Sequence, residues 1–272
     1  MNIKFVRTRH VYDSYCDFWR LVEASKFDTC FVDEIDLREE WACYIFTPMN
    51  GEVVPFLEAQ KIKRSRVVWW NLERPGQDPT TSASIDKLRG LIHAIWVSDQ
   101  RAAQDPRFTY VFMASHEDLG TRSKDRVYDI CTLAYLWGRR RECIDQLKKR
   151  GLSIAPAAYG RWSQDEIVAR SRLMLNLHQY ADAPFVAPLR FAVAAAYAIP
   201  LVSERLAIAQ PGPSFEASLT EIPDNIEALL AYESADELNT RGFLLHHRFC
   251  IHTNFRHEVE QAVNRLARGI TC

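Results

Sequence analysis

Two polar side chains stand one residue apart at the end of an apolar run. Leu173–Leu175 is followed by Asn176 and His178. Alternate residues of a strand share a face, so this spacing predicts that Asn176 and His178 point the same way. An amide both donates and accepts hydrogen bonds, and an imidazole can carry a proton. The pair is therefore either part of a polar ligand site or a set of hydrogen-bonded side chains that caps the following loop.

Arginines occur where two predicted helices begin. Arg139–Arg141 follow Gly138 at the start of the predicted helix 139–151, where cations oppose the helix dipole and a bound anion would relieve the conflict. Arg190 lies in the first turn of a helix that begins at Pro188. A guanidinium beside helix N–H groups can grip a phosphate. A salt-bridged arginine explains Arg190 equally well.

Carboxylates follow several predicted strands. Glu73 comes after one strand of the first half, Asp99 follows Ser98 after the next, and Ser203 with Glu204 ends a strand of the second half. A carboxylate in such a place can act as a general base. Asp99 and Ser203 can also simply cap the next helix, which is the more economical interpretation of each residue alone.

The elements that must position these side chains alternate between strand and helix. This alternation is typical of parallel α/β sheets, in which ligands bind beyond the carboxyl ends of the strands. A polar run at 115–126 predicts a break between two doubly wound halves. The strands predicted for the first half are 2–8, 29–34, 42–48, 66–73, 94–99 and 109–114, with helices at 12–25, 51–63 and 84–93.

The composition is that of an ordinary folded protein. Hydrophobic residues make up 47% and charged residues 25%, and the net charge of −1 does not favour nucleic acid or anionic membranes. No apolar run reaches the roughly 18 residues of a membrane span, and no signal peptide is evident. None of the seven cysteines forms a CxxC motif. The spacing of His252 and His257 could suit zinc, but the sequence offers no CxxC pair to complete such a site. We expect a cytoplasmic protein with reduced thiols and no metal.

Several segments, taken in order, resemble the carboxyl-terminal half of GT-B glycosyltransferases. They lie within 128–232 and include SRLMLNLH (171–178) and PLRFAVAAAYAIPLVSE (188–204), while VVWWNLERPG (67–76) resembles a strand of the first domain. The resemblance implies an α/β fold of the GT-B class, with two Rossmann-like domains facing a cleft and a C-terminal helix crossing back to the first domain. It implies an acceptor domain at 1–120, a donor domain at 121–256 and the terminal helix at 257–272.

The resemblance also implies roles for individual residues. Gly138 with Arg139 or Arg140 matches the turn near the donor diphosphate, and Arg190 matches a phosphate-proximal cation. The strand ends that line the donor site hold Asn176, His178, Ser203 and Glu204.

One position departs from the family pattern. The family often has a glutamate three residues before this arginine, where it binds the donor ribose, and here the residue is Ala187. Alanine accepts no hydrogen bond, so either Asp182 or Glu204 replaces the glutamate, or the donor is held differently, or the activity is weakened or lost.

The function implied is transfer of a hexosyl or pentosyl group from a nucleotide-sugar co-substrate to a hydroxyl, without a metal or other cofactor and with a nucleoside diphosphate as product. Glu73 or Asp99 would be the base of an inverting enzyme, and His178 is a weaker candidate. The acceptor and the oligomeric state are not predicted, although DNA with a modified base stays a named acceptor. A non-catalytic sensor or subunit that binds a nucleotide or nucleotide sugar is the alternative.

Overall fold

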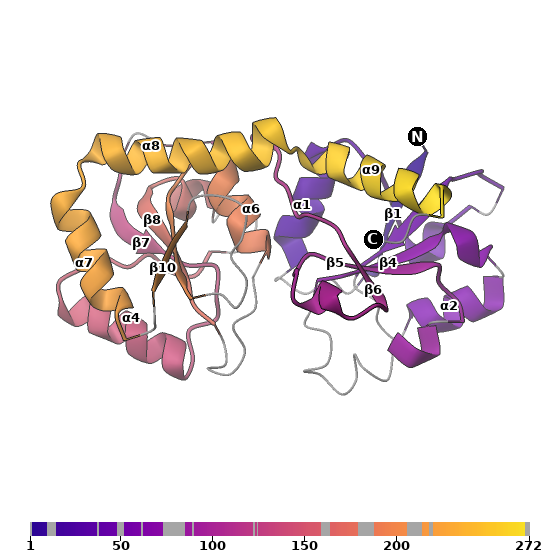
Figure 1. The fold of residues 1–272 in the computed structure, drawn as a ribbon, viewed down its shortest axis with the longest axis horizontal. Helices are drawn as coiled ribbons and strands as arrows, with labels where there is room; N and C mark the ends of the chain where they lie inside the picture. Colours follow the sequence, from indigo (N-terminus) through magenta and orange to yellow (C-terminus); the bar gives the residue numbers. More distant parts are fainter. Residues whose placement is uncertain are drawn as a thin grey trace. The chain divides into compact units, whose positions relative to one another are not determined.

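Two parallel β-sheets organise the chain, each in its own compact unit (Figure 1). The first unit comprises Met1–Tyr15, Val22–Met113 and Arg256–Cys272, and the second comprises Cys16–Leu21 and Ala114–Phe255. The computed structural model describes residues 2–9, 15–36, 38–47, 52–60, 62–72, 85–88, 90–121, 123, 125–158, 164–178, 188–205, 214–217 and 220–269.

The first sheet has six parallel strands in the order β2-β1-β3-β4-β5-β6. All six strands predicted from the sequence are present. The chain leaves β1 toward β2 and then returns to β3 on the other side, so the strand order reverses between β1 and β3. The bounds are Ile3–Arg7 (β1), Asp28–Phe31 (β2), Cys43–Phe46 (β3), Val67–Asn71 (β4), Ala94–Val97 (β5) and Phe108–Tyr110 (β6).

Strand β4 shows why this sheet is stable. Its sequence VVWWN is buried at all five positions, as expected for a parallel strand covered on both faces. Trp69 belongs to the cluster that includes Leu57 of α2 (Val53–Gln60). The next residue, Trp70, points to the other face and meets Trp96 edge to face at 5.5 Å. Its indole N–H donates to Ser98 Oγ over 3.1 Å, so the polar end of the ring is satisfied.

The second sheet has four parallel strands in the order β10-β9-β8-β7. Ile154 bridges to Ile130 and extends the sheet by one parallel contact beyond β7. Leu173 and Leu175 of β8 pack with residues of helices α4 and α7, while the alternate residues face helix α6. The strands are Tyr128–Cys131 (β7), Ser171–Asn176 (β8), Leu201–Glu204 (β9) and Ser214–Ala217 (β10), and the helices are Arg139–Lys149 (α4), Pro188–Ala196 (α6) and Ile222–Tyr232 (α7).

Helix α8 (Ala235–His246) lies directly against α6 (Figure 1). It begins with a capping box in which Ser234 and Glu237 bond to each other's backbone. A Cβ atom at Gly242 would lie 2.0 Å from the carbonyl oxygen of Ala198, so only glycine allows this approach. The helix continues as a π-helical segment, His247–His252, and the last helix, α9, spans Phe255–Ala267.

Helix α1 (Cys16–Ala24) contributes two charged side chains to a buried polar cluster in the second unit. Gln164 donates to Asp17 and accepts from Arg20, and Arg20 also donates to the carbonyl of Leu119 over 2.7 Å. Gln164 begins a π-helical turn, Gln164–Val168. Burial raises the pKa of the Asp17 carboxyl to about 6, against the opposing effects of Arg20 and Gln164.

Replacing Asp17 by asparagine is expected to flatten the pH dependence of stability. The pKa of Asp17 is about 6 in the folded chain and 3.8 as its ordinary value, so the folded state binds more protons between these limits. The wild-type free energy of unfolding therefore falls as the pH rises from about 4 to about 6, by at most ~3 kcal/mol. Urea unfolding at closely spaced pH values measures this slope, and an equal slope in both proteins would contradict the prediction.

Candidate functional site

The strand order of the second sheet reverses beside β7. The chain passes from β7 to the contact at Ile154 on one side and then returns to β8 on the other. Ligands of open α/β sheets bind beyond the carboxyl ends of the strands at such a reversal. Helix α4 begins in the connection after β7, and Gly138 precedes it with a φ of 54°, a conformation that favours glycine. The first N–H groups of α4 lack partners within the helix and can face an anion.

Arg190 joins the carboxyl ends of β7 and β8. Its Nε donates to the carbonyl of Leu133 over 2.9 Å. Its Nη1 donates to Asn176 Oδ1 over 2.7 Å and to the carbonyl of Leu177 over 3.1 Å. The side chain is half-buried, and these contacts hold the guanidinium at the strand reversal.

Asn176 is held from both sides of its amide. Asn176 of β8 is directly opposite Ser203 of β9, so the two side chains lie on the same face of the sheet. Asn176 Nδ2 donates to Ser203 Oγ over 2.9 Å, and Ser203 Oγ donates to the carbonyl of Glu204 over 2.8 Å. Asn176 and Ser203 are fully buried. Ser203 therefore holds the amide of Asn176, and Asn176 in turn holds Arg190 in position.

The Glu204 carboxylate accepts hydrogen bonds from both terminal nitrogens of the Arg139 guanidinium. The distances are 2.9 Å from Nη1 to Oε2 and 2.5 Å from Nη2 to Oε1. The backbone N–H of His178 donates to Glu204 Oε2 over 2.9 Å, and Arg139 Nη1 also donates to the carbonyl of His178 over 3.2 Å. Arg140 is buried and donates to the carbonyl of Leu177 over 3.1 Å. Glu204 therefore compensates the charge of Arg139 at the N-terminus of α4, where a bound anion would also relieve the conflict with the helix dipole.

His178 lies just beyond the end of β8 and is buried. Its Nε2 lies 3.0 Å from the carbonyl of Arg205, so this nitrogen carries the proton and donates. Burial lowers the pKa of the imidazole, an effect that the contact with Arg205 and the charge of Glu204 partly oppose. The ring is neutral at neutral pH and is a weaker base than a free imidazole.

The predicted residues of the first unit divide into one that is described and one that is not. Asp99 follows β5, and its Oδ1 accepts from the N–H groups of Arg101 and Ala102 over 2.8 and 2.9 Å. These bonds hold the backbone just before and at the start of a short 3-10 helix, Ala102–Gln104, whose N-cap residue is Arg101. Glu73 lies outside the described residues, as do Asp182 and Ala187 of the second unit.

Backbone carbonyls and one hydroxyl of the site have no clear sequence signal. The carbonyls of Leu133 and Leu177 hold two of the arginines, and any residue type could supply them. Thr132 directly follows β7 and is fully buried, and its Oγ1 bonds to none of the residues that the structure describes. Buried hydroxyl groups normally bond to protein or to ordered water. A threonine immediately after a strand was the only available hint.

Two further properties concern the described residues as a whole. They contain no cluster of three or more His, Cys, Asp or Glu side chains that could hold a metal ion. None of their helices has the length and apolarity that crossing a bilayer requires.

Comparison with known proteins identifies the fold. No family model matches the sequence, and no curated protein matches it. HepE from Anabaena, solved in complex with UDP-glucose, matches with a TM-score of 0.64 and 10% identity over 96% of this chain and 99% of that one. TarM matches with a TM-score of 0.57 and 10% identity over 82% of this chain and 54% of that one.

A third solved structure also matches the fold of this chain. The pneumococcal O-GlcNAc transferase GtfA, in complex with UDP and GlcNAc, has a TM-score of 0.53 and 10% identity over 79% of this chain and 60% of that one. At these identities the likeness concerns the fold. The α/β fold of the GT-B class, with two Rossmann-like sheets, is confirmed.

Proposed function

We propose that this protein is a glycosyltransferase that moves a sugar from a nucleotide-sugar donor to a hydroxyl acceptor. The observation that carries the proposal is the arginine-lined strand reversal of the second unit, where Arg190 and the N-terminus of α4 lie at the carboxyl ends of β7 and β8. A diphosphate is the ligand class that guanidinium groups and helix N–H groups recognise together. A fold shared with HepE, which was solved with UDP-glucose, supports the same ligand class.

The donor-binding residues divide into two roles. Arg190 and the N–H groups at Gly138–Arg139 stabilise the charge that develops on the departing diphosphate when its bond to the anomeric carbon breaks. The other predicted residues hold that arrangement in place. Arg139 is oriented by Glu204, and Arg190 is oriented by Asn176, which Ser203 fixes. Arg140 and His178 connect the same strand end to α4 and to the chain after β9.

The acceptor side is assigned to the first unit. The acceptor oxygen bonds to the anomeric carbon, and its proton passes to a carboxylate if configuration is inverted. Glu73 and Asp99 are the two candidates, and Asp99 also caps a turn through Oδ1. His178 is the third and weakest candidate for the base, because its pKa is lowered by burial and because it lies among the donor-binding residues.

Replacing Arg190 by alanine is expected to weaken UDP binding by tenfold to a hundredfold, because a hydrogen bond to a charged group contributes about 1.5–3 kcal/mol. Isothermal titration with UDP measures the affinity. Arg141 is the matched control, since it is also an arginine in the first turn of its helix, α4. Its side chain is 73% exposed, and its Nε lies 3.8 Å from Asp145 Oδ2. Arg141→Ala should keep the wild-type affinity. An unchanged affinity in a folded Arg190→Ala protein would remove Arg190 from the site.

Turnover separates the enzyme from a sensor. The wild-type protein would be incubated with UDP-glucose and other nucleotide sugars, and release of nucleoside diphosphate would be followed with sugar, lipid-linked, protein and hydroxymethylated DNA acceptors. Transfer to one acceptor class supports the proposal. Nucleotide binding without transfer or hydrolysis supports the sensor, and the absence of nucleotide binding contradicts both.

A further inference from the structure

The outer face of α8 and of the π-helical segment after it carries large apolar side chains. Phe243, Leu244 and Ile251 are 58%, 52% and 51% exposed. They are half of the large hydrophobic side chains that are exposed in the described part of the chain, and they lie on one short helical stretch. Single exposed hydrophobic residues are ordinary, whereas a cluster marks an interaction surface.

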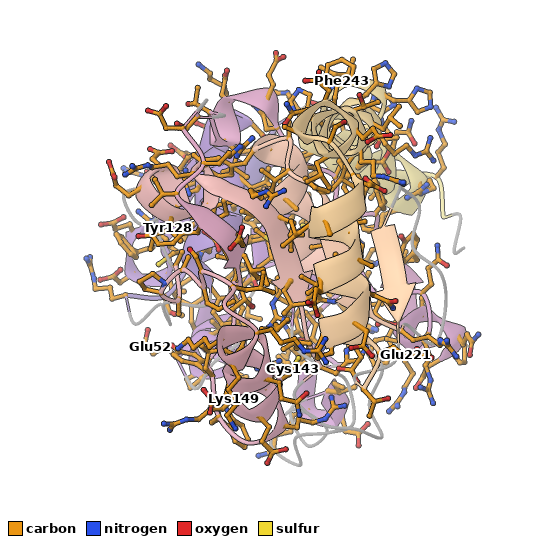
Figure 2. The ribbon with its side chains drawn as sticks, turned by 90° about the vertical axis from the view of Figure 1, so that its left-hand side faces the viewer. Glu52, Tyr128, Cys143, Lys149, Glu221 and Phe243 are labelled. Atoms are coloured by element: carbon orange, nitrogen blue, oxygen red, sulfur yellow. The ribbon has the colours of Figure 1, made fainter. Side chains whose placement is uncertain are left out.

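Polar side chains alternate with these three residues on the same face. Helical neighbours three to four residues apart lie side by side, so His247 and Arg248 stand between the apolar positions. Figure 2 shows Phe243 on the side of α8 turned away from the sheet. We call this surface the docking face. Its exposed residues are Phe243, Leu244, His247, Arg248, Ile251 and His252.

The opposite face of the same helix is fixed to the second unit. Gly242 sits against the backbone of Ala198, and His246 Nδ1 donates to the carbonyl of Ala195 over 2.9 Å. Phe249 stacks on Phe191 with ring centroids 6.5 Å apart. The helix cannot turn about its axis without losing these contacts, so the docking face stays outward. A π-helical segment within a helix is also frequent at functional sites.

The charge of this stretch is positive. Between Glu237 and Glu258 the chain holds three arginines and four histidines. Arg241 pairs with Glu233 over 2.5 Å, and Arg256 pairs with Glu260 over 2.9 Å. Arg248, at the centre of the docking face, makes no ion pair with any described residue. An anionic partner complements this arrangement.

We propose that the docking face binds the surface of an anionic phospholipid bilayer. Phe243, Leu244 and Ile251 enter the boundary between headgroups and acyl chains, and Arg248 contacts lipid phosphate. The surface is a convex helical stripe, which suits insertion into a fluid interface. The helix lies on the bilayer and does not cross it. This inference stands apart from the proposed glycosyl transfer.

Vesicle sedimentation tests the proposal with the full chain. We expect pelleting with phosphatidylcholine vesicles that contain about 30% phosphatidylglycerol, and much less with pure phosphatidylcholine. The double variant Phe243→Ser with Ile251→Ser should lower partitioning at least about tenfold. Val127→Ser is the matched control, because Val127 is 48% exposed and lies outside α8, directly before β7. It should partition like the wild type.

Arg248→Glu provides a second measurement that leaves the apolar side chains intact. It should lower binding to the anionic vesicles and leave binding to neutral ones unchanged. Circular dichroism verifies that each variant is folded. Absence of vesicle binding, or equal binding by the wild type and both docking-face variants, would overturn the proposal. A wild-type dimer that Phe243→Ser dissociates would also overturn it, because the face would then belong to a second copy of the chain.

Discussion

Replacing Gly242 by alanine is expected to destabilise the second unit by about 3 kcal/mol, the upper range for overpacking a well-filled contact. In most helices the same change stabilises by up to about 1 kcal/mol. Here the new Cβ would lie 2.0 Å from Ala198 O and 2.6 Å from Ala198 C, so helix α8 must move away from the turn that follows α6. Ala198 cannot yield easily, because its φ of 49° already lies in the left-handed region, where alanine is strained.

Thermal unfolding followed by circular dichroism measures this effect, with an expected decrease of several degrees in Tm. Gly90→Ala is the matched control, since a Cβ atom at Gly90 would meet nothing within 4 Å. We expect its Tm to equal or slightly exceed the wild-type value. Equal Tm values for Gly242→Ala and the wild type would show that α8 does not pack on α6 as described.

Replacing Glu204 by alanine should lower the free energy of unfolding by about 3 kcal/mol, the lower end for breaking a buried ion pair. Arg139 and Glu204 expose 20% and 10% of their side chains, so the variant leaves a largely buried guanidinium without its carboxylate. The N–H of His178 loses its acceptor as well. Urea unfolding measures the change. Glu227→Ala, which removes an exposed partner of Arg150, should cost less than about 1 kcal/mol.

A double-mutant cycle distinguishes the ion pair from simple loss of packing. Replacing Arg139 by methionine and Glu204 by leucine together should cost clearly less than the sum of the two single changes, because neither charge is then left alone. We expect a coupling energy of about 2 kcal/mol. Additive effects would contradict the bidentate contact.

The strands were predictable because parallel strands covered on both faces leave unbroken apolar runs in the sequence. VVWW and LMLN are examples, and both are strands in the structure. Helix α4 was predictable from its last-turn cations and Gly151. The alternation of strands and helices then predicted a parallel α/β architecture, and the resemblance within 128–232 implied the GT-B class. Helix α8 was missed, since its sequence ADELNTRGFLLH mixes charged and apolar residues without a clear helical period.

The candidate site was predictable in position and less so in its contacts. Strand ends indicated where Asn176 and Glu204 lie, because the carboxyl ends of neighbouring parallel strands meet. The proline at the start of α6 indicated the first-turn position of Arg190. Their partners were not predictable. The pairing of Arg139 with Glu204 joins residues far apart in the chain, and backbone carbonyls accept from Arg190 regardless of residue type. Only the folded chain specifies such contacts.

The division of the chain into units has a consequence for its synthesis. The first unit uses Val22–Met113 and also the last segment, Arg256–Cys272, whereas Ala114–Phe255 belongs to the second. A ribosome adding about 5–20 residues per second needs on the order of ten seconds to make the intervening stretch. During that time the nascent first unit lacks its segment Arg256–Cys272, which holds most of helix α9. The first unit therefore receives its full set of segments only after the whole of Ala114–Phe255 has been made.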